Sequence, residues 1–273
     1  MKTLNKLLIF IFVFNGLLTQ CQSDSNWVFY KIIYLENISP IGIASEDSTL
    51  WISDPENNSI IQLGSTGTVL KKYSDFQRPM HIAVHNHIVY VPEYLSDQIK
   101  LILMDSIKYL QIHTCIDGPS AIDIRDNLIA IADFYNHKIV LVENGKTTLI
   151  GEKGNRHGEL YYPTDVAIKN DLIYVGDAYN NRIQVFDKLG HFQQIIGEFD
   201  DIQVATGIYV SNDHIFVTDF YGNRVLIYDL KGNLIEVLSE QLNGPTDIII
   251  QNNQLYICNY NSQSITIYER YNQ

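Results

Sequence analysis

Apolar and polar residues alternate along most of this chain, in short runs separated by turns. The clearest stretch is residues 163–197, which holds four such runs with Asn, Asp, Gly and Lys between them. Alternation with a period of two is typical of strands whose two faces meet different surroundings. Four short strands joined by short turns form a small antiparallel sheet, which cannot bury its faces alone. The pattern therefore predicts a unit that needs neighbours.

The same unit recurs at a nearly constant spacing. Its opening dipeptide begins at residues 40, 79, 119, 163, 205 and 245. Four strands in roughly 40 residues, repeated around an axis, indicate a β-propeller. We therefore predict one all-β domain over residues 27–273, a six-bladed β-propeller of four-stranded antiparallel blades.

The fourth and fifth units carry a recognisable motif. Residues 163–187 contain Pro-x-x-Val-Ala, followed by Ile-Tyr-Val-x-Asp-x-x-Asn-x-Arg-Ile-Gln-Val-Phe-Asp, and residues 205–229 repeat the pattern. In these segments, and in the connector at 151–163, the chain resembles the NHL-repeat family. The resemblance implies a six-bladed propeller but says little about function, because this fold hosts enzymes, RNA binders and protein-binding platforms.

The two ends of the repeat region complement each other. Residues 28–35 form an apolar run that belongs to no complete unit, whereas the last unit stops after its third run. An N-terminal strand that completed the last blade would hide sheet edges that otherwise promote aggregation. We therefore expect residues 28–35 to pair with residues 264–268 and to close the ring.

The segment before the repeats has the features of an export signal. Residues 1–20 combine a basic start with a short apolar run, which is typical of a signal peptide and too short for a membrane span. The sequence Leu18-Thr-Gln-Cys21 looks like a bacterial lipobox, with Gln20 where a small residue is usual, and residues 21–26 then form a polar tether. We predict lipidation at Cys21 and anchoring in the bacterial cell envelope. Plain secretion, or a periplasmic location, is the alternative.

Charge and cysteine content narrow the picture further. The formal net charge is −12 at pH 7, so the protein repels phosphate backbones and nucleic-acid binding is disfavoured. Cys115 and Cys258 belong to the second and sixth units, which are not neighbours in a six-membered ring. We expect no disulfide between them, since a bridge needs close Cα atoms.

The third position of each unit alternates between small and metal-ligating residues. These positions hold Gly42, His81, Ala121, Asp165, Gly207 and Asp247. The innermost strands of a propeller line its central channel. We therefore hypothesise that His81, Asp165 and Asp247 hold a divalent cation or a polar ligand at the channel mouth. Alternatively, the carboxylates accept hydrogen bonds from neighbouring backbone amides.

The turn between the second and third runs carries two recurring features. Its opening acid recurs in five units, and we interpret it as architectural, with Lys138, Arg182 and Arg224 placed to pair with it across the turn. The turns also carry Tyr94, Phe134, Tyr135, Tyr179, Phe220, Tyr221 and Tyr260. Exposed aromatic residues on one end of the ring would form an amphipathic binding rim. The alternative is that they pack between the blades.

These observations favour a non-catalytic binding platform in the envelope, with a protein, peptide or glycan as its ligand. It would need no cofactor, and it would contact the membrane only through its lipid anchor. The alternative function is a metal-dependent lyase or lactonase with its site at the channel mouth, because related propellers with a central metal include amidating lyases and gluconolactonase-like enzymes. A purely structural envelope protein is a third interpretation.

Overall fold

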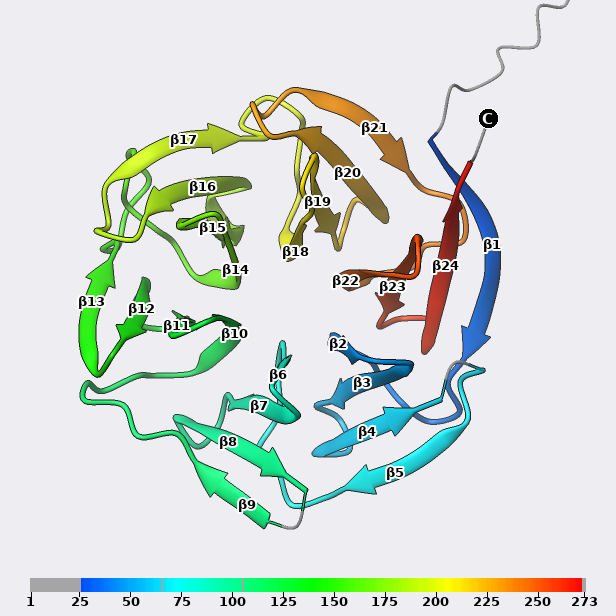
Figure 1. Ribbon diagram of the computed structural model, residues 1–273. Coiled ribbons are helices and arrows are strands. Elements are labelled where there is room, and N and C mark those ends of the chain that lie inside the picture. Colours follow the sequence, from blue (N-terminus) through cyan, green and yellow to red (C-terminus); the bar gives the residue numbers. More distant parts are fainter. Residues whose placement is uncertain (1–25, 65, 105, 272–273) are drawn as a thin grey trace, which may run out of the picture.

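The protein is a ring of six four-stranded antiparallel sheets around a central channel (Figure 1). The computed structural model describes residues 26–64, 66–104 and 106–271. The predicted all-β, six-bladed propeller is therefore confirmed. The predicted signal peptide, the lipidation site at Cys21 and most of the tether lie outside the described residues. Within the described residues, no helix has the length and apolar character needed to cross a membrane.

Each blade has four radial positions. The innermost strands are β2 (Gly42–Glu46), β6 (Ala83–His85), β10 (Pro119–Arg125), β14 (Pro163–Lys169), β18 (Ala205–Val210) and β22 (Pro245–Gln251). The second strands are β3 (Thr49–Asp54), β7 (Ile88–Glu93), β11 (Leu128–Asp133), β15 (Leu172–Asp177), β19 (His214–Asp219) and β23 (Gln254–Asn259). The third strands are β4 (Ser59–Leu63), β8 (Gln98–Leu103), β12 (Lys138–Glu143), β16 (Arg182–Asp187), β20 (Arg224–Asp229) and β24 (Ser264–Arg270). The outermost strands are β5 (Val69–Tyr73), β9 (Ser106–Tyr109), β13 (Lys146–Ile150), β17 (Phe192–Ile196), β21 (Leu234–Leu238) and β1 (Trp27–Tyr34).

The N-terminal strand closes the ring. β1 pairs antiparallel with β24, from Trp27 opposite Arg270 to Tyr34 opposite Ser264. Beyond the strand, the amide of Leu35 donates a hydrogen bond to the carbonyl of Gln263 at 2.7 Å. The last blade therefore joins both ends of the described chain in one sheet, visible as the blue strand outside the red one in Figure 1. The predicted closure is confirmed.

Neighbouring blades share their hydrophobic cores. Between the fourth and fifth blades, for example, Tyr174 and Val185 pack in one buried cluster with Val217 and Leu226. The middle strands are buried on both faces, whereas the outermost β9 is exposed at all four residues. Ile and Val dominate the middle strands because burial of their side chains stabilises the ring by about 25 cal/mol per Å² of apolar surface.

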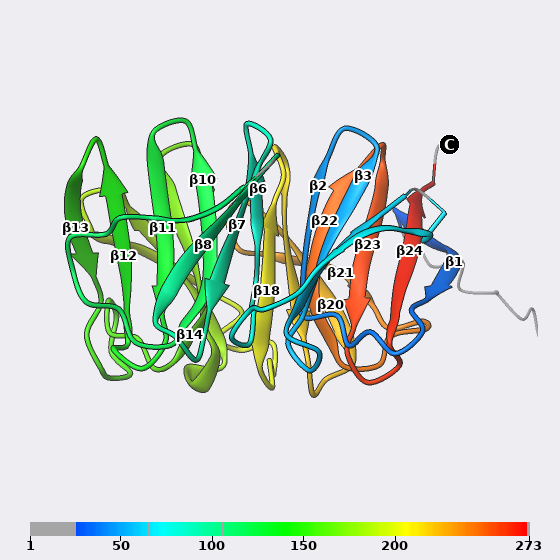
Figure 2. The same ribbon diagram turned by 90° about the horizontal axis from the view of Figure 1, so that it is seen from below.

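The strands run between two ends of the ring (Figure 2). The connector end holds the links between blades and the turns between second and third strands. The opposite end holds the remaining turns. Each innermost strand starts at the connector end, so the first residues of each unit lie near that mouth of the channel.

The acids of the connector-end turns are architectural. The carboxylate of Asp177 accepts a hydrogen bond from the amide of Tyr161 at 2.7 Å and pairs with Arg182 Nε at 2.8 Å. The corresponding pairs Asp219–Arg224 and Asp133–Lys138 have separations of 2.9 and 3.6 Å. Asp133 and Asp219 likewise accept hydrogen bonds from amides of the preceding connector, so each carboxylate ties its own turn to that connector. The sequence predicted the pairing across the turn but not the bond to the connector. Cys115 and Cys258 are both free, the first exposed and the second buried.

Candidate functional site

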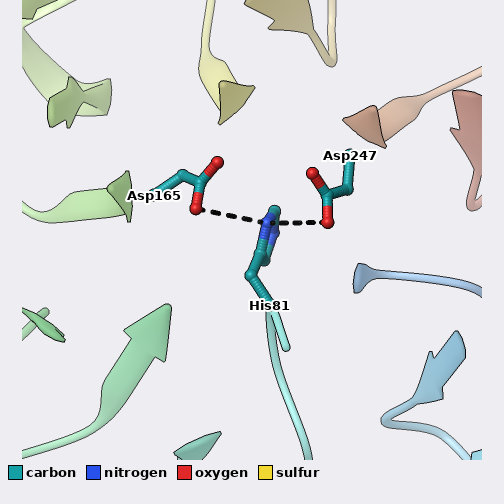
Figure 3. Close-up of side chains that lie close together, drawn as sticks. All are labelled: His81, Asp165 and Asp247. Atoms are coloured by element: carbon teal, nitrogen blue, oxygen red, sulfur yellow. Dashed lines mark ion pairs between the residues drawn. The ribbon is translucent and has the colours of Figure 1, made fainter. Parts of the chain in front are cut away.

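Three blades bring His81, Asp165 and Asp247 together in the middle of the channel. His81 Nδ1 lies 3.6 Å from Asp247 Oδ2 and 3.8 Å from Asp165 Oδ1, and all three side chains are buried (Figure 3). One ligand atom from each residue lies within 4.8 Å of the other two. We call this group the waist cluster. It forms because the second, fourth and sixth blades contribute the larger residue at the same position of their innermost segment.

The small residues between them are required by close packing of adjacent blades. A Cβ atom on Gly42 would lie 2.8 Å from the Cα of His81 in the next blade. A Cβ atom on Gly207 would lie 2.7 Å from the Cα of Asp247 in the blade after it. Real Cβ atoms do not approach so closely, so glycine is needed at both positions. The alternation seen in the sequence is therefore also a packing rule.

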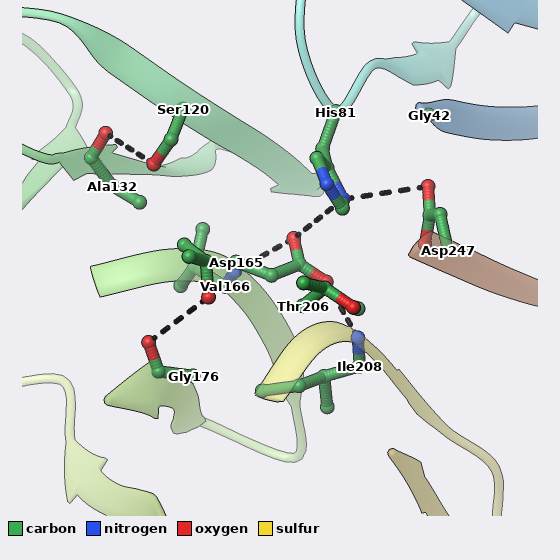
Figure 4. Close-up of polar contacts among 12 residues, drawn as sticks. Gly42, His81, Ser120, Ala132, Asp165, Val166, Gly176, Thr206, Ile208 and Asp247 are labelled. Atoms are coloured by element: carbon green, nitrogen blue, oxygen red, sulfur yellow. Dashed lines mark hydrogen bonds and ion pairs between the residues drawn. The ribbon is translucent and has the colours of Figure 1, made fainter. Parts of the chain in front are cut away.

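The two carboxylates of the waist cluster also join neighbouring blades, as Figure 4 shows for Asp165 and Ile208. Asp165 accepts hydrogen bonds from its neighbour Val166 N at 2.8 Å and from Ile208 N of the next blade at 2.6 Å. Asp247 accepts bonds from Ile43 N and from the following amide, both at 2.8 Å. The backbone bonding that the sequence left as an alternative is thus present. Each carboxylate oxygen retains a second lone pair, so this bonding does not exclude a cation.

Burial shifts all three protonation equilibria toward the neutral forms. It lowers the pKa of His81 to about 4 and raises the pKa of Asp247 to about 7. It also raises the pKa of Asp165, and the neighbouring Asp247 adds to that shift. His81 Nδ1 is buried and has no hydrogen-bond partner among the described residues. An unpaired buried nitrogen is costly, so the waist cluster has the character of a site completed by a further group.

The waist cluster suits a divalent cation in both chemistry and spacing. Imidazole and carboxylate ligands bind transition metals such as zinc at about 2.0–2.2 Å. Two ligand atoms separated by 3.6 Å can both lie at that distance from one ion, at an angle of about 118°. A cation would also favour the ionised carboxylates that burial disfavours.

His81 separates two cavities with different chemistry. The connector-end cavity has a volume of about 450 Å³ and is lined by His81 together with apolar, aromatic and hydroxyl side chains. The opposite-end cavity has a volume of about 240 Å³, and its lining includes Asp123, Asp165, Asp247 and Arg125. The sequence placed the metal candidates at the channel mouth. The structure instead buries them at the waist, with both carboxylates facing the opposite-end cavity.

The hydroxyl groups below the connector-end mouth serve the ring. Ser120 Oγ donates to the carbonyl of Pro163 at 2.8 Å, and Thr164 Oγ1 donates to the carbonyl of Ala205 at 2.7 Å. The equivalent threonines at 206 and 246 donate to the next blades at 3.0 and 3.1 Å. These protons are therefore committed to joining innermost strands, and they are not available to a ligand.

Four of the predicted rim aromatics belong to one cluster over the second, third and fourth blades. The ring centroids of Tyr94 and Phe134 are 5.7 Å apart, and the Tyr94 hydroxyl donates to that of Tyr135 at 2.6 Å. Tyr162, which the sequence analysis did not select, links Phe134 to Tyr179 with centroid distances of 4.7 and 4.8 Å. Tyr135 and Tyr179 remain exposed. The cluster therefore combines packing between blades with an open aromatic surface.

The other three predicted aromatics lie on the fifth and sixth blades. The rings of Phe220 and Tyr221 are 5.2 Å apart, and Tyr221 is exposed. The Tyr260 hydroxyl donates to Glu56 Oε1 at 2.6 Å, and burial raises the pKa of Tyr260 to about 12. The predicted aromatics thus follow the connector end around most of the ring, in two groups rather than one.

The residue before the opening proline of a unit adopts a left-handed backbone in four blades. Gly118 and Gly244 have φ values of 60° and 63°, whereas Arg78 and Tyr162 adopt 55° and 54° with full side chains. Bulky residues are uncommon in this region. The amide of Tyr162 donates to His137 Nδ1 at 3.1 Å, so His137 has an architectural role. A comparison of the residues that precede the opening proline of each unit would have singled out Arg78 and Tyr162, because two other units have glycine at this position.

Comparison with known proteins supports the fold. Residues 160–186 match the family model of the NHL repeat. No curated protein sequence matches the chain. The protein is thus a six-bladed β-propeller, and its fourth unit is an NHL repeat, as the resemblance predicted.

Among solved structures, virginiamycin B lyase from Staphylococcus aureus superposes with a TM-score of 0.67 at 16% identity, over 89% of this chain and 99% of that one. A streptogramin B lyase gives 0.66 at 17% identity, over 91% and 89%. A gluconolactonase from Xanthomonas campestris gives 0.71 at 14% identity, over 87% and 89%. At such low identity these similarities establish the fold alone.

Proposed function

We propose that the protein is a non-catalytic platform that binds a peptide, protein or glycan at the connector end. The observation that carries this proposal is the connector-end cavity of about 450 Å³, whose lining includes Ile41, Met80, Leu95 and Phe134. A concave apolar surface of this size suits one side chain or one ring of a ligand.

The lining of this cavity offers little acid–base chemistry. Its serine and threonine hydroxyl groups donate to backbone carbonyls, the Tyr94 hydroxyl donates to Tyr135, and none of the described residues that line it carries a carboxylate. His81 is neutral at pH 7, because burial lowers its pKa to about 4, and its Nδ1 lies toward Asp165 and Asp247. General acid–base catalysis needs a donor and an acceptor of matched pKa beside the substrate. Binding fits this cavity better than catalysis.

The aromatic rim would extend the binding surface beyond the cavity. Tyr135, Tyr179 and Tyr221 are 47, 60 and 69% exposed on three consecutive blades. Tyrosine offers a large, rigid contact area and a hydroxyl group, and it is enriched among the residues that dominate interfaces. A ligand anchored in the cavity would reach these rings across the same end.

The predicted lipid anchor fits this orientation. β1 is the outermost strand of the last blade (Figure 1), and the carbonyl of Asn26, just before it, accepts a hydrogen bond from the amide of Tyr271 at 2.9 Å. An anchor at Cys21 would precede this outermost strand in the chain, not one of the strands that line the channel. Incorporation of labelled palmitate, lost in Cys21→Ala, is the expected result. Unchanged processing and membrane association in that variant would contradict the anchor.

A direct test of the platform uses arrays of peptides and glycans probed with the purified chain from residue 22. The Tyr135→Ser/Tyr179→Ser/Tyr221→Ser variant should lose the bound ligands and keep its fold, as followed by circular dichroism. Ligands bound equally by both proteins would contradict the rim as the binding surface.

A second candidate function rests on the unpaired His81 Nδ1 between two carboxylates. If His81, Asp165 and Asp247 hold a divalent cation, the protein would be a metal-dependent lyase or lactonase, with the ion as a Lewis acid. A substrate would then reach the three residues from the smaller cavity at the opposite end, which Asp165 and Asp247 line.

Elemental mass spectrometry and thermal unfolding with and without a chelator test this second function. One tightly held metal per chain, absent from a His81→Ala/Asp165→Asn variant, would support it, and lactones would then be the first substrates to assay. No bound metal after growth and refolding in each of zinc, calcium and manganese, with no change on chelation, would contradict it.

A further inference from the structure

Arg78 occupies a strained backbone position at the edge of the connector-end cavity. Its φ of 55° lies in the left-handed region, where the equivalent residues Gly118 and Gly244 have no side chain. Such a conformation costs on the order of 1 kcal/mol or more for a residue with a Cβ atom. Arg78 is one of the residues that line the cavity, so the strained position brings a cationic side chain to its edge.

Arg78 is the single positively charged side chain among the described residues that line this cavity. Apart from His81, whose Nδ1 lies toward Asp165 and Asp247, the remaining polar side chains of the lining are already engaged. The serine and threonine hydroxyls donate to carbonyls, and the Tyr94 hydroxyl donates to Tyr135. A ligand therefore meets unused hydrogen-bond donors chiefly at the guanidinium, and apolar surface elsewhere.

The guanidinium is only loosely paired. Its Nη1 lies 3.7 Å from Glu56 Oε1, beyond hydrogen-bond distance, and the two side chains are 42 and 47% exposed. The same Glu56 oxygen accepts a hydrogen bond from Tyr260 at 2.6 Å. An exposed pair of this geometry contributes little to stability. Arg78 can therefore exchange Glu56 for a better acceptor at small cost.

We infer that the connector-end cavity selects a carboxylate attached to an aromatic or branched apolar group. Arg78 binds the carboxylate through its fork of donors, which matches two carboxylate oxygens. Met80, Leu95 and Phe134 receive the apolar group. The inference rests on the proposed platform and specifies its ligand class. The same chemistry is offered by a free aryl acid and by the C-terminal residue of a peptide.

The test compares acids with their neutral amides. One probe pair is 3-phenylpropionate and 3-phenylpropionamide, and the other is the tripeptide Ala-Ala-Phe with a free or an amidated C-terminus. Binding is measured by ligand-observed NMR and calorimetry at low and high salt. We expect each acid to bind at least about tenfold more tightly than its amide, as a charge-assisted hydrogen bond provides. The pair with the larger difference identifies the source of the carboxylate.

Arg78→Gly is the decisive variant, because two other blades already have glycine at this position. It should remove the preference for acids while unfolding at the same or a higher temperature, since the strain is relieved. Arg78→Lys should retain a reduced preference. The matched control is Arg156→Gln, because Arg156 lies in an exposed connector and does not line the cavity. It should leave binding unchanged.

Each result separates the inference from the platform. If acids and amides bind equally, and Phe134→Ala abolishes both, the platform stands and the carboxylate inference is overturned. If no probe binds while the arrays yield ligands sensitive to the rim variant, the inference is again overturned. If neither probes nor arrays bind, both proposals fail.

Discussion

The two cavities on either side of His81 differ in almost every physical respect. The connector-end cavity is lined mainly by apolar and aromatic side chains and carries one arginine. The opposite-end cavity is smaller and has three aspartates as well as one arginine, Arg125, in its lining. The innermost segments line both cavities, and turn residues such as Tyr94 and Phe134 add to the connector-end cavity. The difference shows that the repeat determines the backbone of the ring, whereas a few side chains at one or two positions of each unit determine what each end of the channel can bind.

The waist cluster and the rim also differ in how strongly function is tied to stability. Asp165 and Asp247 each bridge two blades, so any change at these residues disturbs the ring. The rim residues Tyr135, Tyr179 and Tyr221 lie in turns and remain exposed. Substitutions should therefore separate the two regions by their effects on unfolding.

The largest effect is expected at the waist. Asp165→Ala leaves the buried amides of Val166 and Ile208 without an acceptor, and should cost about 2–4 kcal/mol of unfolding free energy. Asp165→Asn keeps one acceptor oxygen and should cost less. Urea unfolding of the protein treated with a chelator measures the cost of each variant. An alanine variant within about 0.5 kcal/mol of the wild type would show that the inter-blade bonds are dispensable.

A smaller change in unfolding free energy is expected when the pH is varied for the protein treated with a chelator. Asp247 has its pKa raised to about 7, so its contribution is complete below the unfolded pKa near 4 and is lost as pH rises through about 7. Asp165 changes in the same direction. His81, with its pKa lowered to about 4, acts oppositely: its contribution is complete above about 6.5 and is lost as pH falls through about 4.

Burial raises the pKa of two carboxylates and lowers the pKa of one imidazole, so the net unfolding free energy should fall between about pH 4.5 and pH 7. Unfolding midpoints across this range measure the slope. Asp247→Asn should flatten it, whereas the exposed Asp171→Asn should not. A wild-type slope unchanged by Asp247→Asn would assign the pH dependence to other groups.

The smallest effect on stability is expected at the rim. Tyr135, Tyr179 and Tyr221 are exposed, so their combined replacement by serine should cost less than about 2 kcal/mol. This replacement removes the hydrogen bond between the Tyr94 and Tyr135 hydroxyl groups, together with the ring contacts of Tyr179 with Tyr162 and of Tyr221 with Phe220. Calorimetric unfolding measures the cost. A destabilisation comparable to that of Asp165→Ala would favour packing between blades over binding, and would remove the contrast between rim and waist.

Periodicity was sufficient for the fold because each unit repeats the same physical requirement. A strand with two buried faces needs alternating or continuous apolar residues, and the turns need Asn, Asp and Gly at defined positions. The last unit has three runs, the apolar residues 28–35 offered a fourth strand, and β1 pairs with β24 in that way. The third-position alternation likewise brought out His81, Asp165 and Asp247, because ring symmetry converts equal positions into neighbours.

Other features depend on contacts that a single unit does not encode. The waist cluster is buried because the innermost strands approach each other closely at Gly42 and Gly207. Its two carboxylates line the opposite-end cavity. The aromatic cluster needed Tyr162 as its link, and the role of Arg78 needed its left-handed backbone and its distance from Glu56. Repetition specified the strands and their order from local patterns alone. The chemistry of the channel was decided by side chains from different blades, whose distances exist only once the ring has closed.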